Sequence, residues 1–252
     1  MSLVWLNGAI LAADAARIDP ADRGFTLGDG LFETIRAEAG APLHAPRHFA
    51  RLRAGAAVLG IPVPYDDSAL GAALCALLRE NRLAEAALRL TLTRGPATRG
   101  VLPQGVASPT LLVTAGMMPA ALGPARLIIA RGTRRNEASP LSRIKSLNYL
   151  DGVLARREAA AAGADDALLL NTRGDLAEAT AANVFLRIGG EWVTPRVADG
   201  ALPGIARGVL LEAGEAREAM ITEADCGRAE AGFLVNSLGR REVAEIKGSA
   251  SF

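Results

Sequence analysis

The alternation of apolar and polar residues predicts a series of short strands in the first half of the chain. Residues 4–11 predict a strand, a tight turn and a second strand, and residues 31–37 alternate as a half-buried strand does. Residues 88–93 and 110–114 predict two further strands, which are joined by a glycine-containing loop. This half of the chain is therefore expected to be rich in strands.

Apolar residues recur at helical spacing in two places between these strands. Pro46 suits the first turn of a helix that extends to Leu59, because the first turn does not use the backbone N–H that proline lacks. A second helix is expected to begin at Asp67 and Ser68 and to extend to Leu78. Strands and helices thus occur together, which is typical of a mixed α/β domain.

This pattern is interrupted between Met117 and Pro124, where two prolines and a glycine occur without clear periodicity. We interpret residues 117–124 as a connection between domains. The connection separates an N-terminal domain, residues 1–116, from a C-terminal domain, residues 125–252. No fixed-period repeat is present, so we expect two mixed α/β (α+β) domains.

The second half of the chain also predicts both strands and helices. The strands are expected at residues 126–130, 167–170, 183–186 and 232–236, and the helices at residues 149–162 and 207–214. Gly163 is expected to end the first of these helices. The strand at residues 232–236 is expected to be the last one, and the polar residues 239–243 match no predicted element.

Composition and charge exclude several classes of function. The chain has 252 residues, of which 50% are hydrophobic and 22% charged, with a formal net charge of +1. This balance gives no electrostatic reason to expect binding to nucleic acid or to an anionic membrane. The N-terminal residues lack the basic stretch and apolar run of a signal peptide, and no apolar run reaches membrane-spanning length. We therefore expect a cytoplasmic protein.

Cysteine and histidine, the usual ligands of zinc, are scarce. Cys75 and Cys226 lie far apart in the sequence, and His44 and His48 are the only histidines. This spacing argues against a disulfide framework and against a structural zinc site. We expect no metal site.

Lysine is rare in a chain with many arginines. Among the 28 Lys and Arg residues only Lys145 and Lys247 are lysine. A lysine amine can lose its proton and attack a carbonyl, whereas a guanidinium stays charged. Lys145 is therefore a candidate nucleophile, although a genomic bias toward arginine would also leave few lysines.

Several stretches around Lys145 resemble, in order along the chain, the fold-type IV pyridoxal-phosphate enzymes. This class IV aminotransferase family includes branched-chain aminotransferases, D-amino-acid aminotransferases and aminodeoxychorismate lyases. The stretches are residues 28–33 (GDGLFE), 47–52 (RHFARL), 144–148 (IKSLN), 176–185 (LAEATAANVF) and 202–207 (LPGIAR). The resemblance implies pyridoxal 5'-phosphate as cofactor and a D-amino-acid-aminotransferase-like fold. It also implies a small N-terminal α/β domain, a larger C-terminal cofactor-binding domain and a homodimer.

The resemblance assigns roles toward the cofactor to three residues. Lys145 is expected to bond the cofactor's aldehyde and to transfer a proton at the substrate. Glu178 is expected to face the pyridine nitrogen, because a neighbouring carboxylate keeps that nitrogen protonated. Tyr149 is expected either to hydrogen-bond the cofactor's phenolic oxygen or to pack at the start of a helix.

A phosphate needs a cation and backbone N–H groups at the start of a helix. Arg51 matches the arginine that binds phosphate in the family, although an arginine at this spacing can also be a surface residue. Gly204, Ile205 and Ala206 are expected to supply backbone groups at the head of the last predicted helix. Ser237 is expected to add a hydroxyl.

Arg94, Arg99 and Arg36 are the candidates for binding the carboxylate of a small amine substrate. Arg94 and Arg99 lie in a loop that resembles the carboxylate-binding stretch of some relatives, and a guanidinium binds carboxylate in a bidentate manner. A solvated pair of loop arginines is the alternative. Arg36 alternates with apolar residues on its strand, so it faces either the cofactor or water.

Three residues near the glycine turn are candidates to line the pocket, namely Thr26, Phe32 and Glu33. Their position close to the GDG stretch is the reason for this interpretation. For Phe32 we favour packing in the hydrophobic core, since most aromatic residues at alternating strand positions are buried there.

Two departures from the aminotransferase pattern favour a lyase. Ala206 stands where aminotransferases of the family usually have threonine or serine, and Asn236-Ser237-Leu238 replaces their Ser-Gly-Thr or Ser-Ser-Thr. The resemblance thus implies 4-amino-4-deoxychorismate lyase, which releases pyruvate and forms 4-aminobenzoate for folate biosynthesis. A D-amino-acid or branched-chain aminotransferase, a transferase of the same family, is the alternative. A cofactor-free dimeric binding module is a remote one.

Overall fold

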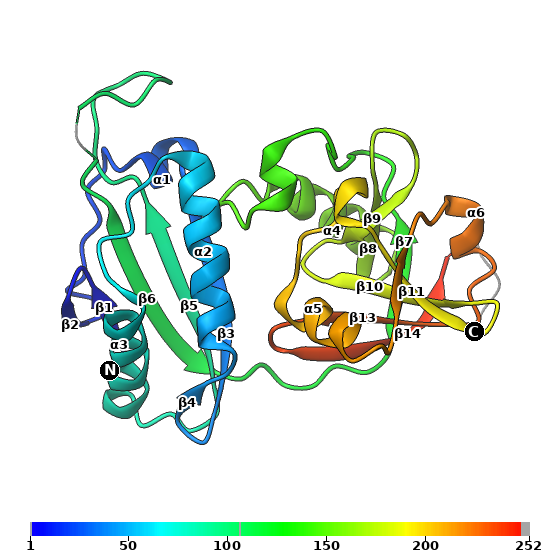
Figure 1. Cartoon of the computed structure of the whole chain (residues 1–252), viewed down its shortest axis with the longest axis horizontal. Coiled ribbons are helices and arrows are strands. Elements are labelled where there is room, and N and C mark those ends of the chain that lie inside the picture. Colours follow the sequence, from blue (N-terminus) through cyan, green and yellow to red (C-terminus); the bar gives the residue numbers. More distant parts are fainter. Residues whose placement is uncertain (1, 106, 248–252) are drawn as a thin grey trace. The chain divides into compact units, whose positions relative to one another are not determined.

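The computed structural model describes residues 2–105 and 107–247, which form two compact units (Figure 1). Unit 1 joins the residues up to Pro119 with the short segment Ile144–Leu147. Unit 2 joins Ala120–Arg143 with the residues from Asn148 onward. The division at Pro119 falls inside the predicted connection. The segment Ile144–Leu147, which lies within the predicted C-terminal domain in the sequence, is part of unit 1.

Unit 1 is built on a six-stranded antiparallel sheet with the strand order β2-β1-β6-β5-β3-β4. The strands are β1 (Leu3–Leu6), β2 (Ala9–Ala12), β3 (Gly30–Glu38), β4 (Ala41–Pro42), β5 (Ala86–Thr93) and β6 (Thr110–Met117). The strands predicted at residues 4–11, 31–37, 88–93 and 110–114 are therefore confirmed. The short helix α1 (Arg23–Leu27) precedes β3 and was not predicted.

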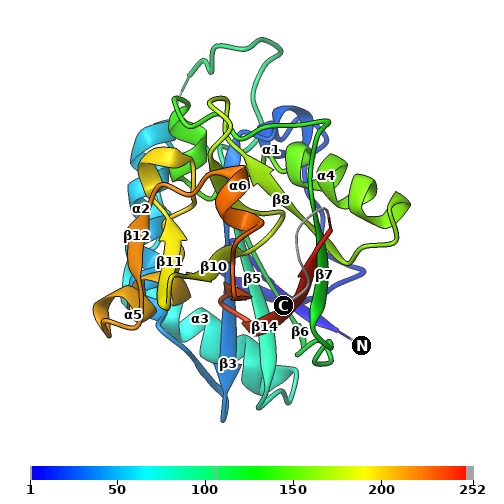
Figure 2. The same ribbon diagram turned by 90° about the vertical axis from the view of Figure 1, so that its right-hand side faces the viewer.

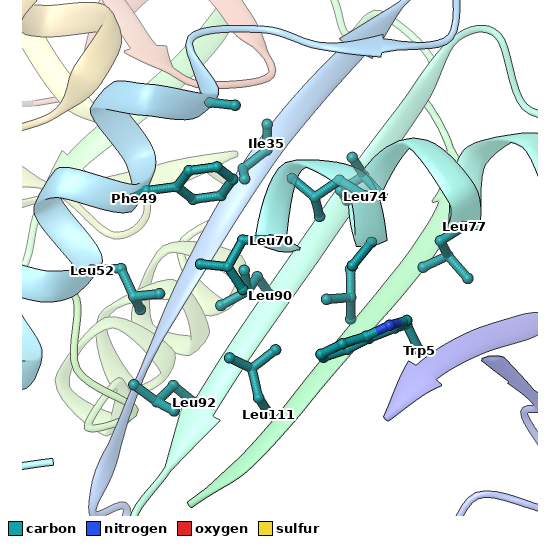
Figure 3. Close-up of a cluster of buried hydrophobic side chains, with 14 of the residues drawn as sticks. Trp5, Ile35, Phe49, Leu52, Leu70, Leu74, Leu77, Leu90, Leu92 and Leu111 are labelled. Carbon is teal, nitrogen blue, oxygen red and sulfur yellow. The ribbon is translucent and has the colours of Figure 1, made fainter. Parts of the chain in front are cut away.

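Two helices, α2 (Ala45–Leu59) and α3 (Asp67–Glu80), cover one face of this sheet (Figure 1). Both were predicted, and Asp66 begins α3 as expected of a capping residue, because its side chain accepts a hydrogen bond from the N–H of Ala69. Figure 3 shows the core between helices and sheet, in which Leu74 and Leu77 of α3 are fully buried. Truncating either leucine to alanine removes roughly 2–5 kcal/mol of stability in a core of this kind.

Unit 2 contains an eight-stranded mixed sheet with the order β12-β11-β10-β13-β14-β7-β8-β9. Its strands are β7 (Ala125–Ile129), β8 (Asp166–Leu170), β9 (Leu176–Ala179), β10 (Asn183–Ile188), β11 (Glu191–Pro195), β12 (Arg217–Ala219), β13 (Ala231–Asn236) and β14 (Gly239–Ile246). Its helices are α4 (Leu150–Ala161), α5 (Ile205–Glu212) and α6 (Glu223–Cys226), with 3-10 turns at Pro140–Arg143 and Val197–Asp199.

Small side chains let α4 pack closely against the sheet of unit 2, beside β8 (Figure 2). Ala155 and Ala159 of α4 are fully buried in one cluster with Ala167 and Leu169 of β8. Gly152 is required in the first turn, because a Cβ there would lie 2.9 Å from a backbone oxygen.

The prediction that β13 is the last strand is wrong, because β14 follows it. β14 pairs antiparallel with β13 and parallel with β7, so it lies inside the sheet. Only Val243 and Ile246 of β14 are buried, while Arg240 and Glu242 are exposed. A strand with so few apolar residues gives almost no alternation signal, although its first half pairs with β13 and its second half with β7.

No helix within residues 2–105 and 107–247 is long and apolar enough to cross a membrane. Within the same residues, no group of three or more His, Cys, Asp and Glu side chains is arranged to hold a metal ion. Both cysteines are free thiols: Cys75 is exposed on α3 and Cys226 is buried in unit 2.

The two thiols are expected to differ strongly in reactivity. Burial, followed by the charges of Asp225 and Glu223, raises the pKa of the Cys226 thiol to about 12, and a thiol reacts as its thiolate. In native protein at pH 8, an aromatic disulfide reagent should therefore modify Cys75 rapidly and Cys226 only after unfolding in denaturant. A Cys75→Ser control should lose the fast phase alone. Two fast equivalents in the native wild type would contradict the core packing around Cys226.

Candidate active site

Lys145 lies on the four-residue segment that pairs with the start of β3. The carbonyl of Lys145 accepts a hydrogen bond of 2.9 Å from the N–H of Phe32, and the N–H of Leu147 donates one of 2.9 Å to the carbonyl of Gly30. Gly30 has no room for a side chain, since a Cβ would lie 2.5 Å from the carbonyl oxygen of Leu92 and 2.9 Å from Leu147. The glycine of the GDG stretch is thus what allows the lysine segment to approach the sheet.

The side chain of Lys145 lies over the ring of Phe32. The Lys145 Nζ atom is 4.3 Å from the ring centroid, and the Arg89 Cζ atom is 3.8 Å from the same centroid. Leu31 and Ile35, on alternate positions of β3, belong to the core under the helices, whereas Phe32 is not part of that cluster. Phe32 is buried, as we expected, and its ring also contacts two cations.

Arg89 is a candidate site residue that our sequence interpretation missed. On β5 the apolar residues Leu88, Leu90 and Leu92 are fully buried in the core, so Arg89 between them points to the opposite face. It stands opposite Thr34 of β3, two residues from Phe32. Strand alternation could have revealed its direction, but its contact with the Phe32 ring depends on the pairing of β3 and β5.

Arg36 lies further along the same face of β3. It is partly buried and forms an ion pair of 2.7 Å with Glu38 on the same strand. An ion pair at the surface of this kind contributes little to stability. Its role toward a substrate stays a prediction.

Arg94 is held by internal contacts that the sequence did not reveal. Its Nε and Nη2 donate to the carboxylate of Asp29 at 2.7 and 3.2 Å, and its Nη1 and Nη2 donate to the carbonyls of Gly60 and Leu59 at the end of α2. Burial alone raises the pKa of the Asp29 carboxyl, but hydrogen bonds and charges from Arg94 and Arg23 hold it below its usual range. These contacts give Arg94 a structural role in tying its loop to α2.

Arg99 and Thr26 line one cavity of unit 1 with a volume of about 590 Å³. Arg23 contributes to the same lining, and it donates hydrogen bonds to the carbonyls of Gly100 and Val101. Arg99 itself is exposed. The two loop arginines therefore differ in their surroundings. Arg94 is hydrogen-bonded to Asp29 and to the end of α2, whereas Arg99 lines a cavity.

Arg51 belongs to a buried cluster with Glu33 and His48. Arg51 Nε donates to Glu33 Oε1 at 2.9 Å and Arg51 Nη2 donates to Glu33 Oε2 at 2.6 Å, while His48 Nδ1 lies 2.6 Å from Oε2. Burial would raise the pKa of the Glu33 carboxyl, but these hydrogen bonds and charges lower it below its usual range. Glu33 is therefore an ion-pair partner under α2 rather than the pocket-lining residue we expected.

In unit 2, Glu178 lies beside the start of α5. Its Oε1 is 3.0 Å from Arg135 Nε, and its Oε2 accepts a 3.0 Å hydrogen bond from the N–H of Leu202. The carbonyl of Leu202 in turn accepts hydrogen bonds from Asn183 Nδ2 at 2.9 Å and from the N–H of Gly204 at 2.8 Å. The loop at residues 202–204 therefore joins the predicted cofactor carboxylate to the predicted phosphate site. Arg135, which the sequence did not single out, keeps that carboxylate paired.

Gly204 begins α5 without a side chain that could cap it. A Cβ at Gly204 would lie 2.1 Å from Asn183 Oδ1, so only glycine fits there. Ile205 and Ala206 form the first turn and are partly buried. A helix start without a side-chain cap presents backbone N–H groups that suit a phosphate, and a paired carboxylate suits a protonated ring nitrogen. These residues of unit 2 fit pyridoxal phosphate.

Tyr149 and Ser237 are the remaining predicted cofactor residues, and both are partly buried. Tyr149 is the residue that precedes α4, and its side chain does not cap that helix. Ser237 lies in the turn between β13 and β14. The turn is fixed by Asn236, whose side chain donates to the carbonyl of Ala181 at 3.2 Å and accepts from the N–H of Leu238 at 2.9 Å. The roles of Tyr149 and Ser237 toward the cofactor stay predictions.

The chain matches the family model described as "Amino-transferase class IV" over residues 30–247. It is 36% identical over 211 residues to the "Putative branched-chain-amino-acid aminotransferase" of Methanocaldococcus jannaschii, covering 83% of this chain and 73% of that protein. It is 29% identical over 213 residues to the aminodeoxychorismate lyase of Bacillus subtilis, with the same coverage. The crystal structure of 4-amino-4-deoxychorismate lyase from Pseudomonas aeruginosa superposes with a TM-score of 0.84 at 32% identity, covering 99% of this chain and 93% of that one.

Replacing Gly204 by alanine should destabilise unit 2. The backbone of Gly204 has φ −68° and ψ 143°, which alanine adopts freely, so the only obstacle is the contact with Asn183. Displacing that side chain breaks its bond to Leu202, and we expect a loss of roughly 1–3 kcal/mol. Denaturant unfolding followed by Trp192 fluorescence, in a Trp5→Phe background, measures the change.

Gly208, one turn later in α5, is the matched control. A Cβ at Gly208 meets only Glu212 Oε1 at 4.0 Å. Gly208→Ala in the helix interior should therefore be neutral or stabilising by up to about 1 kcal/mol. An equal effect of the two substitutions would show that Asn183 does not restrict position 204.

Proposed function

Because the chain belongs to the class IV aminotransferase family, we propose that it is the pyridoxal-phosphate-dependent enzyme 4-amino-4-deoxychorismate lyase. Enzymes of this family use pyridoxal 5'-phosphate and include both lyases and aminotransferases. The choice of lyase rests on Ala206, which supplies no hydroxyl in the first turn of α5. Aminotransferases of the family usually have threonine or serine at this position. The likeness to the Pseudomonas aeruginosa lyase supports the same choice.

In the proposed reaction the substrate loses one proton and one side chain. When bound, the cofactor supplies an aldehyde that bonds a lysine amine and a conjugated ring that accepts electron density. Lys145 Nζ holds the aldehyde until the substrate amine displaces it, and then accepts the proton from the amine-bearing ring carbon. The enol-ether side chain leaves with the electrons of its C–O bond and takes up this proton from Lys145, which gives pyruvate, and the remaining ring becomes aromatic 4-aminobenzoate.

Glu178 is proposed to stabilise the protonated pyridine nitrogen. A carboxylate favours a positive charge beside it, and the ion pair with Arg135 keeps Glu178 anionic. The hydrogen bond from Leu202 orients the carboxylate relative to the start of α5. Glu178 thereby holds a proton at the pyridine nitrogen throughout the reaction, and does not itself exchange one with substrate.

The phosphate is proposed to bind Arg51, the backbone N–H groups of Ile205 and Ala206, and the Ser237 hydroxyl. The guanidinium provides charge-assisted hydrogen bonds, and the helix start adds partial positive charge. Since Ala206 supplies no hydroxyl, more of the phosphate's binding depends on Arg51 and on the backbone. Tyr149 is proposed to contact the cofactor's phenolic oxygen.

Arg89 is proposed to bind a substrate carboxylate, together with Arg36 and Arg99. The substrate is a dicarboxylate, so one cation is insufficient to neutralise it. The guanidinium of Arg89 and the amine of Lys145, the proposed nucleophile, both contact the Phe32 ring. Arg94 is absent from this proposal because its N–H groups bind Asp29 and two backbone carbonyls.

We also propose that the enzyme is a cytoplasmic homodimer. Phe25, Val101 and Leu102 are large apolar side chains with exposures of 79%, 85% and 76%, and they lie on and near the segments that line the cavity of unit 1. A second copy of the chain would cover this apolar surface. The mass of the particle in solution, measured by light scattering, tests the dimer.

A class IV aminotransferase is the second candidate function. The Methanocaldococcus jannaschii relative, at 36% identity, is named for branched-chain aminotransfer, which favours this candidate. The two activities share the proposed roles of Lys145 and Glu178 and differ in whether a keto acid is needed.

Lys145 should be the only lysine that bonds the cofactor. Borohydride treatment of the yellow holoenzyme should fix one phosphopyridoxyl group on Lys145, detected by peptide mass spectrometry, because reduction makes the lysine–cofactor bond permanent. Lys145→Ala should abolish labelling and activity, whereas Lys247→Ala, the matched control on the one other lysine, should leave both unchanged. A colourless protein that takes up no pyridoxal phosphate would instead favour the binding module.

The lyase should act without a second substrate. Incubation with aminodeoxychorismate and no keto acid should release pyruvate and 4-aminobenzoate in equal amounts over many turnovers, because no amino group has to be passed on. Coupled lactate dehydrogenase measures the pyruvate. Absence of pyruvate, together with amino transfer from D-alanine or L-leucine to 2-oxoglutarate, would replace the lyase by the aminotransferase.

A further inference from the structure

We propose that Glu33 and His48 are positioning residues that fix the direction of the Arg51 guanidinium and thereby set the preference of the enzyme for a phosphorylated cofactor. The inference rests on the proposed function, in which Arg51 binds the cofactor phosphate. It concerns two residues that would not touch the cofactor themselves.

The ion pair between Glu33 and Arg51 uses one defined edge of the guanidinium. Nε and Nη2 of Arg51 donate to the two carboxylate oxygens of Glu33 at 2.9 and 2.6 Å. A planar guanidinium bound in this way has its orientation fixed, and its second edge, formed by Nη1 and Nη2, points away from the carboxylate. In the proposed function, this second edge forms the bidentate contact with the phosphate.

His48 contacts the Glu33 carboxylate, which in turn binds Arg51. His48 Nδ1 lies 2.6 Å from Glu33 Oε2, and both side chains are about 1% exposed. His48 and Arg51 are three residues apart on α2, so they face the same side of the helix. Glu33 projects from β3 between the core residues Leu31 and Ile35, where an unpaired carboxylate would be strongly unfavourable.

Positioning and simple electrostatics predict opposite effects. The negative charge of Glu33 offsets the positive charge of Arg51, so it weakens the general attraction of this site for a phosphate dianion. If charge alone governed binding, removing the carboxylate would tighten the binding of phosphate. If direction governs it, the same change weakens binding, because the carboxylate then no longer holds the Arg51 guanidinium in this orientation.

The experiment compares the dissociation constants of pyridoxal 5'-phosphate and of pyridoxal for the cofactor-free full chain, measured by absorbance titration. Glu33→Gln removes the charge while keeping the shape, and we expect it to reduce the preference for the phosphorylated form roughly 10- to 100-fold, as expected when a charge-assisted hydrogen bond is lost. Affinity for pyridoxal should stay unchanged. Arg51→Gln should reduce the preference at least as much.

His48 provides a second, independent pair of variants. Asparagine places an amide N–H close to the position of Nδ1, so His48→Asn should retain the preference within about threefold, whereas His48→Ala should lose it as Glu33→Gln does. A merely structural role would lower the affinity for both forms of the cofactor alike. Thermal unfolding of each cofactor-free variant identifies the variants that fold. If Glu33→Gln does not fold, the comparison of His48→Asn with His48→Ala tests the positioning role.

Each outcome has one meaning. An unchanged or increased preference in Glu33→Gln, with the preference lost in Arg51→Gln, overturns the positioning role and leaves Arg51 as the phosphate residue. An unchanged preference in Arg51→Gln overturns the role of Arg51 and the inference with it. Wild-type protein that binds neither form rejects the proposed function itself.

Discussion

The candidate site depends on the backbone pairing between the lysine segment and β3. Two hydrogen bonds, from Phe32 to Lys145 and from Leu147 to Gly30, fix Ile144–Leu147 to the sheet of unit 1. The chain before and after this segment belongs to unit 2. Lys145, the proposed nucleophile, is therefore positioned by a strand far away in the sequence, on a sheet rather than on an isolated loop. This arrangement places the ammonium over the Phe32 ring, which a second cation, Arg89, also contacts.

A second constraint is that the carboxylates of the site are paired with arginine. Glu33 pairs with Arg51 under α2, and Glu178 pairs with Arg135 beside the start of α5. An arginine does not lose its proton, so the guanidinium of such a pair stays charged even where the pair is largely buried. In both pairs arginine supplies a permanent positive charge. Lys145, the proposed nucleophile, differs from these arginines because its ammonium can lose a proton.

Local patterns predicted most of the elements but little of the site's geometry. The helix starting near Pro46 and the alternating strand at residues 31–37 depend on nearby residues, so sequence was sufficient for them. The strand β14 was missed because only Val243 and Ile246 are buried in it. The direction of Phe32 and the partners of Arg94 depend on how distant segments pack, which periodicity does not report. The expected roles of Lys145 and Glu178 follow from the resemblance to the family. Their hydrogen bonds and ion pairs within the protein depend on the folded chain and are visible only in the structure.

The central proposal is that Lys145 bonds the aldehyde of the cofactor and that Glu178 faces its ring nitrogen. A crystal structure of the holoenzyme tests this claim most directly. The account predicts electron density that is continuous from Lys145 Nζ to the cofactor, with a Glu178 carboxylate oxygen at hydrogen-bonding distance from the pyridine nitrogen. A cofactor attached elsewhere, or a ring nitrogen that faces solvent away from Glu178, would contradict it.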